Sequence, residues 1–128
     1  MSSVLFLVDH TAGKISKASG ELATYAKSIG ESVAVIFADN ADAIASQLNT
    51  FPVDKIITVS GEWDKYGAPA IAEGLSQLIT AKSPAAVLIT STATGKEIAA
   101  RVSVITGSGI ITDAVSVDKD LITTQSVF

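Results

Sequence analysis

Short apolar blocks alternate along this chain with longer segments in which apolar residues recur at helical spacing. The blocks at residues 4–8, 33–38, 56–59 and 85–90 are rich in apolar residues and are predicted to be strands. The first of them is continuously apolar, as in a strand that is covered on both faces. The segments between them place apolar residues three or four positions apart, which predicts amphipathic helices packed on a sheet. Such repeated strand–helix units favour a mostly parallel sheet with helices on both faces.

Capping and helix-breaking residues divide these segments. We expect the first helix to end at Gly30, because glycine is common directly after a helix. Asp39 or Asn40 can cap a short second helix. Phe51 and Pro52 should end it, because a residue before proline disfavours helical geometry.

A loop is predicted over residues 61–67, before a third helix that Ser83 and Pro84 close. This loop holds Tyr66 and the only tryptophan of the chain, Trp63. Their rings can stack on a partner or a ligand. Anchoring of the loop in the core is the alternative.

The fourth helix has the clearest start signal. Thr94 and Glu97 have the spacing of a capping box, in which each side chain bonds the backbone N–H of the other residue. Gly107 and Gly109 are expected to stop this helix. Its apolar face is formed by residues at positions i, i+4 and i+7, which are Ile98, Val102 and Ile105.

After the fourth helix the pattern changes. Val115 and Val117 alternate with polar residues, a tight turn follows, and the chain then alternates loosely up to Phe128. We predict a β-hairpin over residues 113–128 at the edge of the sheet. The predicted fold is α/β, a Rossmann-like three-layer sandwich with a mostly parallel sheet, helices on both faces and this C-terminal edge hairpin. The Rossmann-like strand order is assigned by analogy.

The composition narrows the classes of function. Of the 128 residues, 48% are hydrophobic and 17% charged, and no apolar run is long enough to predict a membrane span. Cysteine is absent, so disulfides and cysteine metal sites are excluded. A cytoplasmic location is expected, or the mitochondrial matrix in a eukaryote. The net charge of −4 and the scattered basic residues argue against nucleic acid as a partner.

Gly95 and Lys96 invite comparison with a phosphate-binding loop. A Walker motif needs glycine five residues before its Gly-Lys pair and Ser or Thr after the lysine. Thr90 and Glu97 occupy those two positions, and the carboxylate would repel phosphate. An anion bound at the helix N-terminus stays open as an alternative to plain capping.

Gly107, Ser108 and Gly109 resemble the beginning of a dinucleotide fingerprint. They follow a helix rather than a strand, and Thr112 stands at the third glycine position, so a helix-ending turn is the alternative. The loop after the first strand, residues 9–14, also lacks G-x-G-x-x-G, although this fold would place a dinucleotide site there.

Asp9 and His10 lie at the carboxyl end of the first strand, the edge where open α/β sheets bind ligands. Successive strand residues point in opposite directions, so Asp9 is poorly placed to orient His10 as a base, and a structural or solvated histidine is the alternative. Asp9, Asp39 and Asp113 could gather around Mg²⁺ or act only as caps and turn residues. We therefore assign no catalytic, cofactor-binding or metal-binding residue to this chain.

Several segments resemble one known family, in the order in which they occur there. Residues 4–15 are similar to a first strand, an acidic residue with histidine and a glycine loop, with Asp9 in place of the usual glutamate. Residues 21–30 are similar to the family's first helix. Residues 109–114 are similar to the start of a later strand, with Thr112 for serine and Asp113 retained.

The strongest likeness is in residues 91–102. Gly95, Lys96, Arg101 and Val102 match the family pattern, and Ala100 replaces an expected proline. On these motifs the chain resembles the N-terminal domain of the electron transfer flavoprotein alpha subunit over essentially all of its length.

The resemblance implies a role in electron transfer. In that family an alpha and a beta subunit of similar fold form a heterodimer, and FAD carries electrons from flavin dehydrogenases to an acceptor. Residues 1–128 would then be the N-terminal α/β domain, a scaffold and subunit-interaction domain that is an electron-carrier component and not an enzyme. FAD would be bound mainly by a C-terminal domain absent from this chain, so no cofactor is expected here. The apolar chain end at Phe128 agrees with a continuation beyond it.

Two other functions stay open at this level. A stand-alone adenine-nucleotide-binding α/β module would share this architecture, but it needs a glycine-rich phosphate loop that the sequence lacks. A hydrolase or transferase would have to use Asp9 and His10.

Overall fold

In the described part of the chain the main sheet has five strands, and all of its neighbouring strands are parallel, in the order β5-β4-β1-β6-β7. The computed structural model describes residues 3–11, 13–82, 84–90, 93–106 and 111–113. The strands of this sheet are β1 (Ser3–Leu7), β4 (Glu31–Ala38), β5 (Lys55–Ser60), β6 (Ala86–Ile89) and β7 (Ile111–Asp113). Numbered along the chain by themselves, they have the order 3-2-1-4-5 of a Rossmann-like sheet. The predicted α/β sandwich with a parallel sheet and its Rossmann-like strand order are therefore confirmed.

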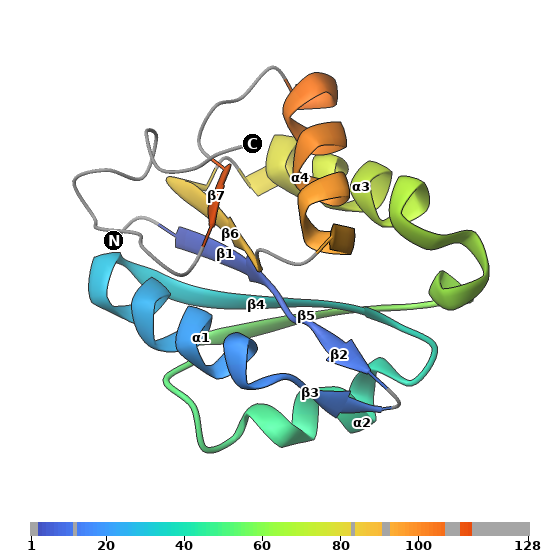
Figure 1. The fold of residues 1–128 in the computed structure, drawn as a ribbon. Helices are drawn as coiled ribbons and strands as arrows, with labels where there is room; N and C mark the ends of the chain where they lie inside the picture. Colours follow the sequence, from blue (N-terminus) through green and yellow to red (C-terminus); the bar gives the residue numbers. More distant parts are fainter. Residues whose placement is uncertain (1–2, 12, 83, 91–92, 107–110, 114–128) are drawn as a thin grey trace.

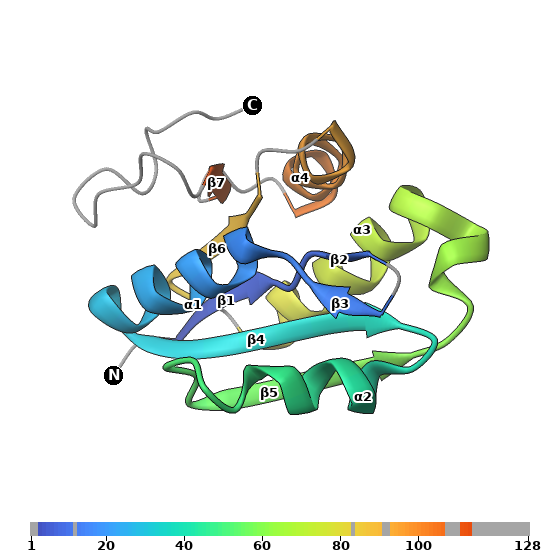
Figure 2. The same cartoon turned by 60° about the horizontal axis from the view of Figure 1, so that its bottom comes forward.

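Helices cover both faces of this sheet, as Figures 1 and 2 show. The described helices are α1 (Lys17–Ile29), α2 (Ala41–Ala45) with its 3₁₀ continuation η1 (Ser46–Leu48), α3 (Trp63–Lys82) and α4 (Ala93–Thr106). α1 and α2 pack on one face, whereas α3 and α4 pack on the other. No helix in this part of the chain combines the length and apolar character needed to cross a membrane.

β1 supplies residues to both hydrophobic cores. Val4 and Phe6 face the core under α1 and α2, and Leu5 and Leu7 face the core under α3 and α4. This alternation follows from the two-residue repeat of a strand. The continuous apolar block of the sequence thus corresponds to a strand that is covered on both sides.

Between β1 and α1 the chain forms a small antiparallel ribbon, where the sequence predicts a simple loop. β2 (His10–Thr11) pairs with β3 (Lys14–Ile15), and the turn contains Gly13 with a φ of 78°, in the left-handed region that glycine tolerates. The side chain of Gln47 ties this ribbon to η1. Its carbonyl accepts the N–H of Ile15 at 3.0 Å, and its amide donates to the carbonyl oxygen of Gly13 at 2.6 Å.

The caps predicted for α1 and α2 are confirmed only in part. Gly30 is the C-cap of α1, as predicted, and donates its N–H to the carbonyl oxygen of Ala26 at 3.0 Å. Its φ of 177° is ordinary extended backbone, so glycine is not required there by conformation. Asn40 is the N-cap of α2, but its side chain makes no capping hydrogen bond.

The capping box predicted for α4 is wrong. The helix already begins at Ala93, so Thr94 lies inside its first turn instead of preceding it. The carboxylate of Glu97 accepts a hydrogen bond from Nε of Arg101 at 3.1 Å, which makes an i,i+4 ion pair on the exposed side of the helix.

The apolar face of α4 is only partly buried. Ile98 and Val102 are 3% and 0% exposed, as predicted, but Ile105 is 50% exposed because it borders a groove with α3. After α4, β7 extends the parallel sheet beside β6. The predicted stop at Gly107 and Gly109 and the rest of the predicted hairpin, residues 114–128, lie outside the described residues.

A surface carboxylate joins the loop before β5 to the start of β4. The two carboxylate oxygens of Asp54 accept hydrogen bonds from Nζ of Lys27 at 2.8 and 3.0 Å, and one of them accepts the N–H of Ser32 at 2.8 Å. The N–H of Asp54 donates in turn to the carbonyl oxygen of Ser32 at 2.8 Å. The hydrogen bonds from Lys27 and then Ser32 hold the pKa of Asp54 below its ordinary value.

We expect Asp54→Asn to lower the urea midpoint of unfolding at pH 7, because a neutral amide bonds Lys27 and Ser32 more weakly. A carboxyl group whose pKa is lowered by folding stabilises the protein above its unfolded pKa and loses that contribution as the pH falls through the folded pKa. The difference from the parent protein should therefore shrink toward about pH 3. Asp39→Asn, at an exposed aspartate, is the control. Equal midpoints at pH 7, or an undiminished difference at low pH, would contradict this account.

Candidate functional site

A cavity of about 230 Å³ opens at the carboxyl edge of the sheet. It lies beyond the ends of β1 and β6, which are neighbours in the sheet although the chain runs from β1 to β4 on one side and reaches β6 only later. This change of side is the switch point at which open α/β sheets bind ligands. The walls come from the ends of β1, β4 and β6 and from the first turns of α3 and α4.

Asp9 and His10 supply the polar groups at the end of β1. The hydroxyl of Ser19 fixes the backbone of Asp9, because it accepts the Asp9 N–H at 2.8 Å and donates to the Asp9 carbonyl oxygen at 3.0 Å. Nε2 of His10 lies 2.9 Å from the carbonyl oxygen of Phe37, and this nitrogen carries the proton because a carbonyl oxygen only accepts. His10 is thus tied to β4, and the two residues are not arranged as an acid–base couple.

Trp63 and Phe37 form an aromatic wall of the cavity. Their rings meet edge to face with centroids 4.9 Å apart, and Nε1 of Trp63 donates to the carbonyl oxygen of Val59 at 2.8 Å. The loop predicted over residues 61–67 is wrong from Trp63 onward, where the chain is already helical. The helix kinks at Gly67, which has a φ of 72° that other residues rarely adopt. Glycine thus permits the change of direction between the turn that carries Trp63 and the rest of α3.

Thr90 directly follows β6 and belongs to the candidate site. In the sequence it had drawn attention only as part of the failed phosphate motif. The buried polar residues of the described chain are Ser19, Ser32, Ser76 and Thr90. Each serine hydroxyl donates to a backbone carbonyl oxygen. Thr90 is 5% exposed and lines the cavity, but its hydroxyl has no hydrogen-bond partner among the described residues.

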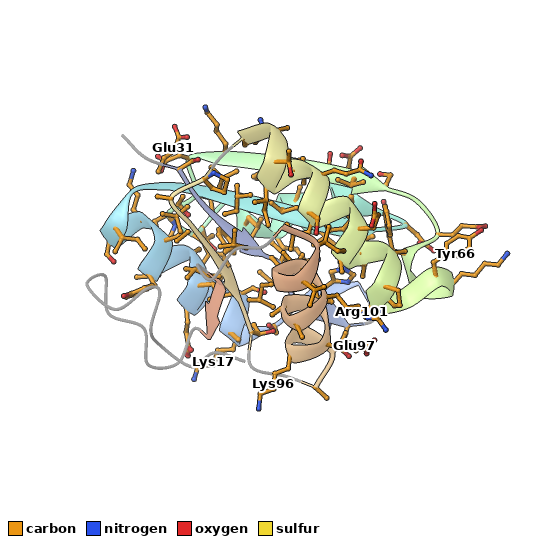
Figure 3. The ribbon with its side chains drawn as sticks, turned by 90° about the horizontal axis from the view of Figure 1, so that it is seen from above. Lys17, Glu31, Tyr66, Lys96, Glu97 and Arg101 are labelled. Atoms are coloured by element: carbon orange, nitrogen blue, oxygen red, sulfur yellow. The ribbon has the colours of Figure 1, made fainter. Side chains whose placement is uncertain are left out.

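Thr94 and Gly95 bring the N-terminal turn of α4 to the opposite wall. The helix dipole there favours negative charge, whereas the carboxylate of Asp9 disfavours it. Lys96 projects away from the molecule in Figure 3, so the Gly-Lys pair does not direct its cation into the cavity. This geometry gives no support to a phosphate loop.

The hypothesised Mg²⁺ site receives no support within the described part of the chain. No group of three or more acidic or histidine side chains there is arranged to hold a metal ion. Asp39 lines a separate hollow beside the ribbon of β2 and β3. The side chain of Asp113 lies outside the described residues.

A groove of about 540 Å³ lies between α3 and α4. Its lining includes Pro69, Glu73 and Arg101 together with two adjacent aliphatic residues of α4, Val104 and Ile105. These two side chains are 83% and 50% exposed, and they form a small apolar patch beside charged groups. α4 thus exposes two adjacent aliphatic side chains beside this groove.

Tyr66 lies apart from both concave surfaces. It is 60% exposed, and Nζ of Lys65 lies 5.7 Å from the centre of its ring. Figure 3 shows it projecting from the end of α3, so only Trp63 of the two predicted aromatic residues belongs to the cavity.

Comparison with known proteins identifies the family of this chain. A family model described as electron transfer flavoprotein domain matches residues 4–128. The chain belongs to the electron transfer flavoprotein family. The resemblance found in the sequence motifs is therefore confirmed.

The curated relatives are named as alpha subunits of electron transfer flavoproteins. The one from Mycobacterium leprae is 37% identical over 131 residues, which cover 100% of this chain and 41% of the relative. Those from Mycobacterium tuberculosis and Syntrophomonas wolfei are 36% and 28% identical over 100% and 92% of this chain, and over 41% and 38% of their own lengths. The chain thus spans about two fifths of the length of the curated relatives it matches.

Gly74 lets α3 approach the aromatic wall closely. A Cβ at this position would lie 2.7 Å from Cε1 of Phe37 and 3.7 Å from the Trp63 ring. Phe37 is only 3% exposed and packs against Trp63, so it has little room to move aside.

We expect Gly74→Ala to lower the free energy of unfolding by about 1–2 kcal/mol, because overpacking costs about 1–3 kcal/mol and outweighs the gain of up to about 1 kcal/mol in helix propensity. Chemical denaturation followed by Trp63 fluorescence measures the effect. Thr80→Ala, at an exposed position of α3, is the control for propensity alone. A Gly74→Ala protein as stable as the parent would show that the wall repacks without strain.

Proposed function

We propose that this chain is the N-terminal scaffold and subunit-interaction domain of an electron transfer flavoprotein alpha subunit. In the intact heterodimer a second alpha-subunit domain would hold FAD, a beta subunit would complete the complex, and the flavin would carry electrons from dehydrogenases to an acceptor. The observation that carries this proposal is the family match over residues 4–128, together with relatives that are named alpha subunits and are much longer than this chain.

The carboxyl edge of the sheet supports a scaffold role over a flavin-binding one. The cavity of about 230 Å³ is smaller than the pockets of roughly 300–1,000 Å³ that hold drug-sized ligands. In dinucleotide-binding domains a glycine-rich turn leads from the first strand directly into a helix. Here the ribbon of β2 and β3 occupies that place instead.

The alternative of a stand-alone adenine-nucleotide module is not favoured by any phosphate-binding feature of the described chain. The N-terminal turn of α4 lines the same cavity as Asp9, whose negative charge disfavours phosphate, and Lys96 projects away from the molecule (Figure 3). The electron-carrier proposal includes the cytoplasmic or mitochondrial location that the sequence predicts.

α4 is the proposed partner surface. It carries the exposed side chains of Lys96 and Arg101 and borders the groove with Val104 and Ile105. An apolar patch rimmed by charged residues combines the two properties of protein interfaces, a hydrophobic centre and a polar rim.

The location of the flavin can be tested by visible absorption spectroscopy. We expect the product of the intact gene, co-expressed with its neighbouring genes, to be yellow with a flavin spectrum. The 128-residue chain alone should be colourless and should not retain added FAD after gel filtration. Tight stoichiometric FAD binding by residues 1–128 would contradict the proposal that a second alpha-subunit domain binds the flavin.

Charge reversal tests the partner surface. We expect Lys96→Glu or Arg101→Glu to weaken assembly with the beta subunit by roughly tenfold, equivalent to about 1.4 kcal/mol. Arg101 lines the groove beside the apolar patch, and Lys96 is exposed on the same helix. Gel filtration of the purified subunits at several concentrations measures the effect. Lys17→Glu, on the α1 side of the sheet, is the matched control (Figure 3). Unchanged assembly of both α4 variants would show that another surface meets the beta subunit.

A further inference from the structure

The hydroxyl of Thr90 requires an explanation that the electron-carrier role does not supply. Buried polar groups are almost always hydrogen-bonded, and an unpaired one indicates a water or ligand. Thr90 is 5% exposed, and no described residue bonds its hydroxyl. The hydroxyl oxygen is not among the fully enclosed unpaired atoms of the described chain, and Thr90 lines the switch-point cavity.

Two further polar groups of the lining have unused hydrogen-bonding capacity. No described residue bonds the carboxylate of Asp9. His10 uses Nε2 for the carbonyl oxygen of Phe37, which leaves Nδ1 of the neutral ring as an acceptor. Asp9 and His10, which follow β1, therefore offer acceptors to N–H donors, and Thr90, which follows β6, offers a hydroxyl that can also donate.

The rest of the lining is apolar and aromatic. Leu7, Phe37, Trp63, Ile71 and Ile98 all contribute to it. The cavity volume is about 230 Å³, and an apolar protein cavity of about 150 Å³ is known to take one benzene ring. The space therefore suits a single or fused ring, and it is too small for a whole dinucleotide.

The charges around the cavity oppose each other. The Asp9 carboxylate disfavours an anion, and the N-terminal turn of α4 at Thr94 and Gly95 disfavours a cation. A neutral occupant avoids both penalties. The occupant also needs an N–H donor for Asp9 or His10 and an acceptor atom for the Thr90 hydroxyl.

We propose that the switch-point cavity binds an uncharged heteroaromatic ring that carries N–H donors beside acceptor atoms, the chemistry of a purine or pyrimidine base. The ring lies among the apolar walls, donates to Asp9 or Nδ1 of His10, and accepts from Thr90. This inference goes beyond the electron-carrier role and does not depend on it.

Trp63 provides a local reporter, because it is the only tryptophan of the 128-residue chain and lines the cavity. Adenosine and uridine are titrated into the chain while Trp63 fluorescence is recorded, with inorganic phosphate as a separate titrant. We expect a saturable change with at least one nucleoside, with a Kd on the order of 1 mM or tighter, and none with phosphate. No saturable response to either nucleoside, or a response to phosphate alone, overturns the proposal.

Two variants assign the response to the Thr90 hydroxyl. Thr90→Val removes that hydroxyl with little change of shape and should weaken nucleoside binding at least tenfold. Thr58→Val, the same change on the exposed strand β5, should leave binding unchanged. Equal binding by Thr90→Val and the parent chain overturns the proposal.

The stability of the Thr90→Val variant tests independently whether the hydroxyl is bonded within the protein. A hydroxyl without a protein partner contributes nothing to the folded state, so the urea midpoint should stay the same or rise. A lower midpoint would show that the hydroxyl is bonded within the protein, and it would overturn the proposal. Weak nucleoside binding and tight FAD retention are separate readouts, so failure of one proposal is distinguishable from failure of the other.

Discussion

The fold depends on the complete burial of β1 on both of its faces. Val4, Leu5 and Phe6 are at most 1% exposed, and each such side chain contributes about 1.5–3 kcal/mol by leaving water. A strand covered on both sides needs helices above and below it, so the chain must cross from one face of the sheet to the other. The separate cores under α1 with α2 and under α3 with α4 are the direct consequence.

The cavity follows from the same crossing. β1 leads to α1 on one face of the sheet and β6 leads to α4 on the other, so the space beyond their ends lies at the switch point. The apolar strand residues give way there to Asp9 and Thr90, and the first turns of α3 and α4 close the sides. The site is thus a product of topology, whereas its chemistry is set by the few residues that end each strand. The Asp9 carboxylate there disfavours a phosphate, whereas the Thr90 hydroxyl can donate or accept a hydrogen bond.

The sequence predicted the strands, which depend on local periodicity. It failed for the helix starts, which depend on contacts between distant residues. The apolar blocks located four of the five parallel strands of the described chain, and three of these, β1, β4 and β6, are continuously apolar because they are buried on both faces. The fourth, β5, is an edge strand whose residues are exposed or half-buried. The spacing of Thr94 and Glu97 could not reveal that the helix starts earlier, at Ala93. The helical turn at Trp63 depends on its packing against Phe37 and on the kink at Gly67, and neither leaves a periodic signal.

The candidate site was predictable only in its location. The edge at Asp9 and His10 follows from the strand pattern, but the bond from His10 to Phe37 joins strands that are far apart in sequence. In the sequence, Thr90 only ends the fourth apolar block and stands at the first glycine position of the failed Walker motif. Its importance lies in having no hydrogen-bond partner among the described residues, which is a property of the folded environment and not of the residue type.

α4 shows how one helix can serve both the core and a partner. Ile98 and Val102 are explained by the core that they fill, but Val104, which is 83% exposed, is explained by no described contact. The surface ion pair between Glu97 and Arg101 stabilises the helix by at most about 1 kcal/mol. Covering an aliphatic side chain such as Val104 would contribute about 1.5–3 kcal/mol. In the proposed heterodimer the affinity would therefore come mainly from the apolar patch, while the charged rim would set orientation and the rate of encounter.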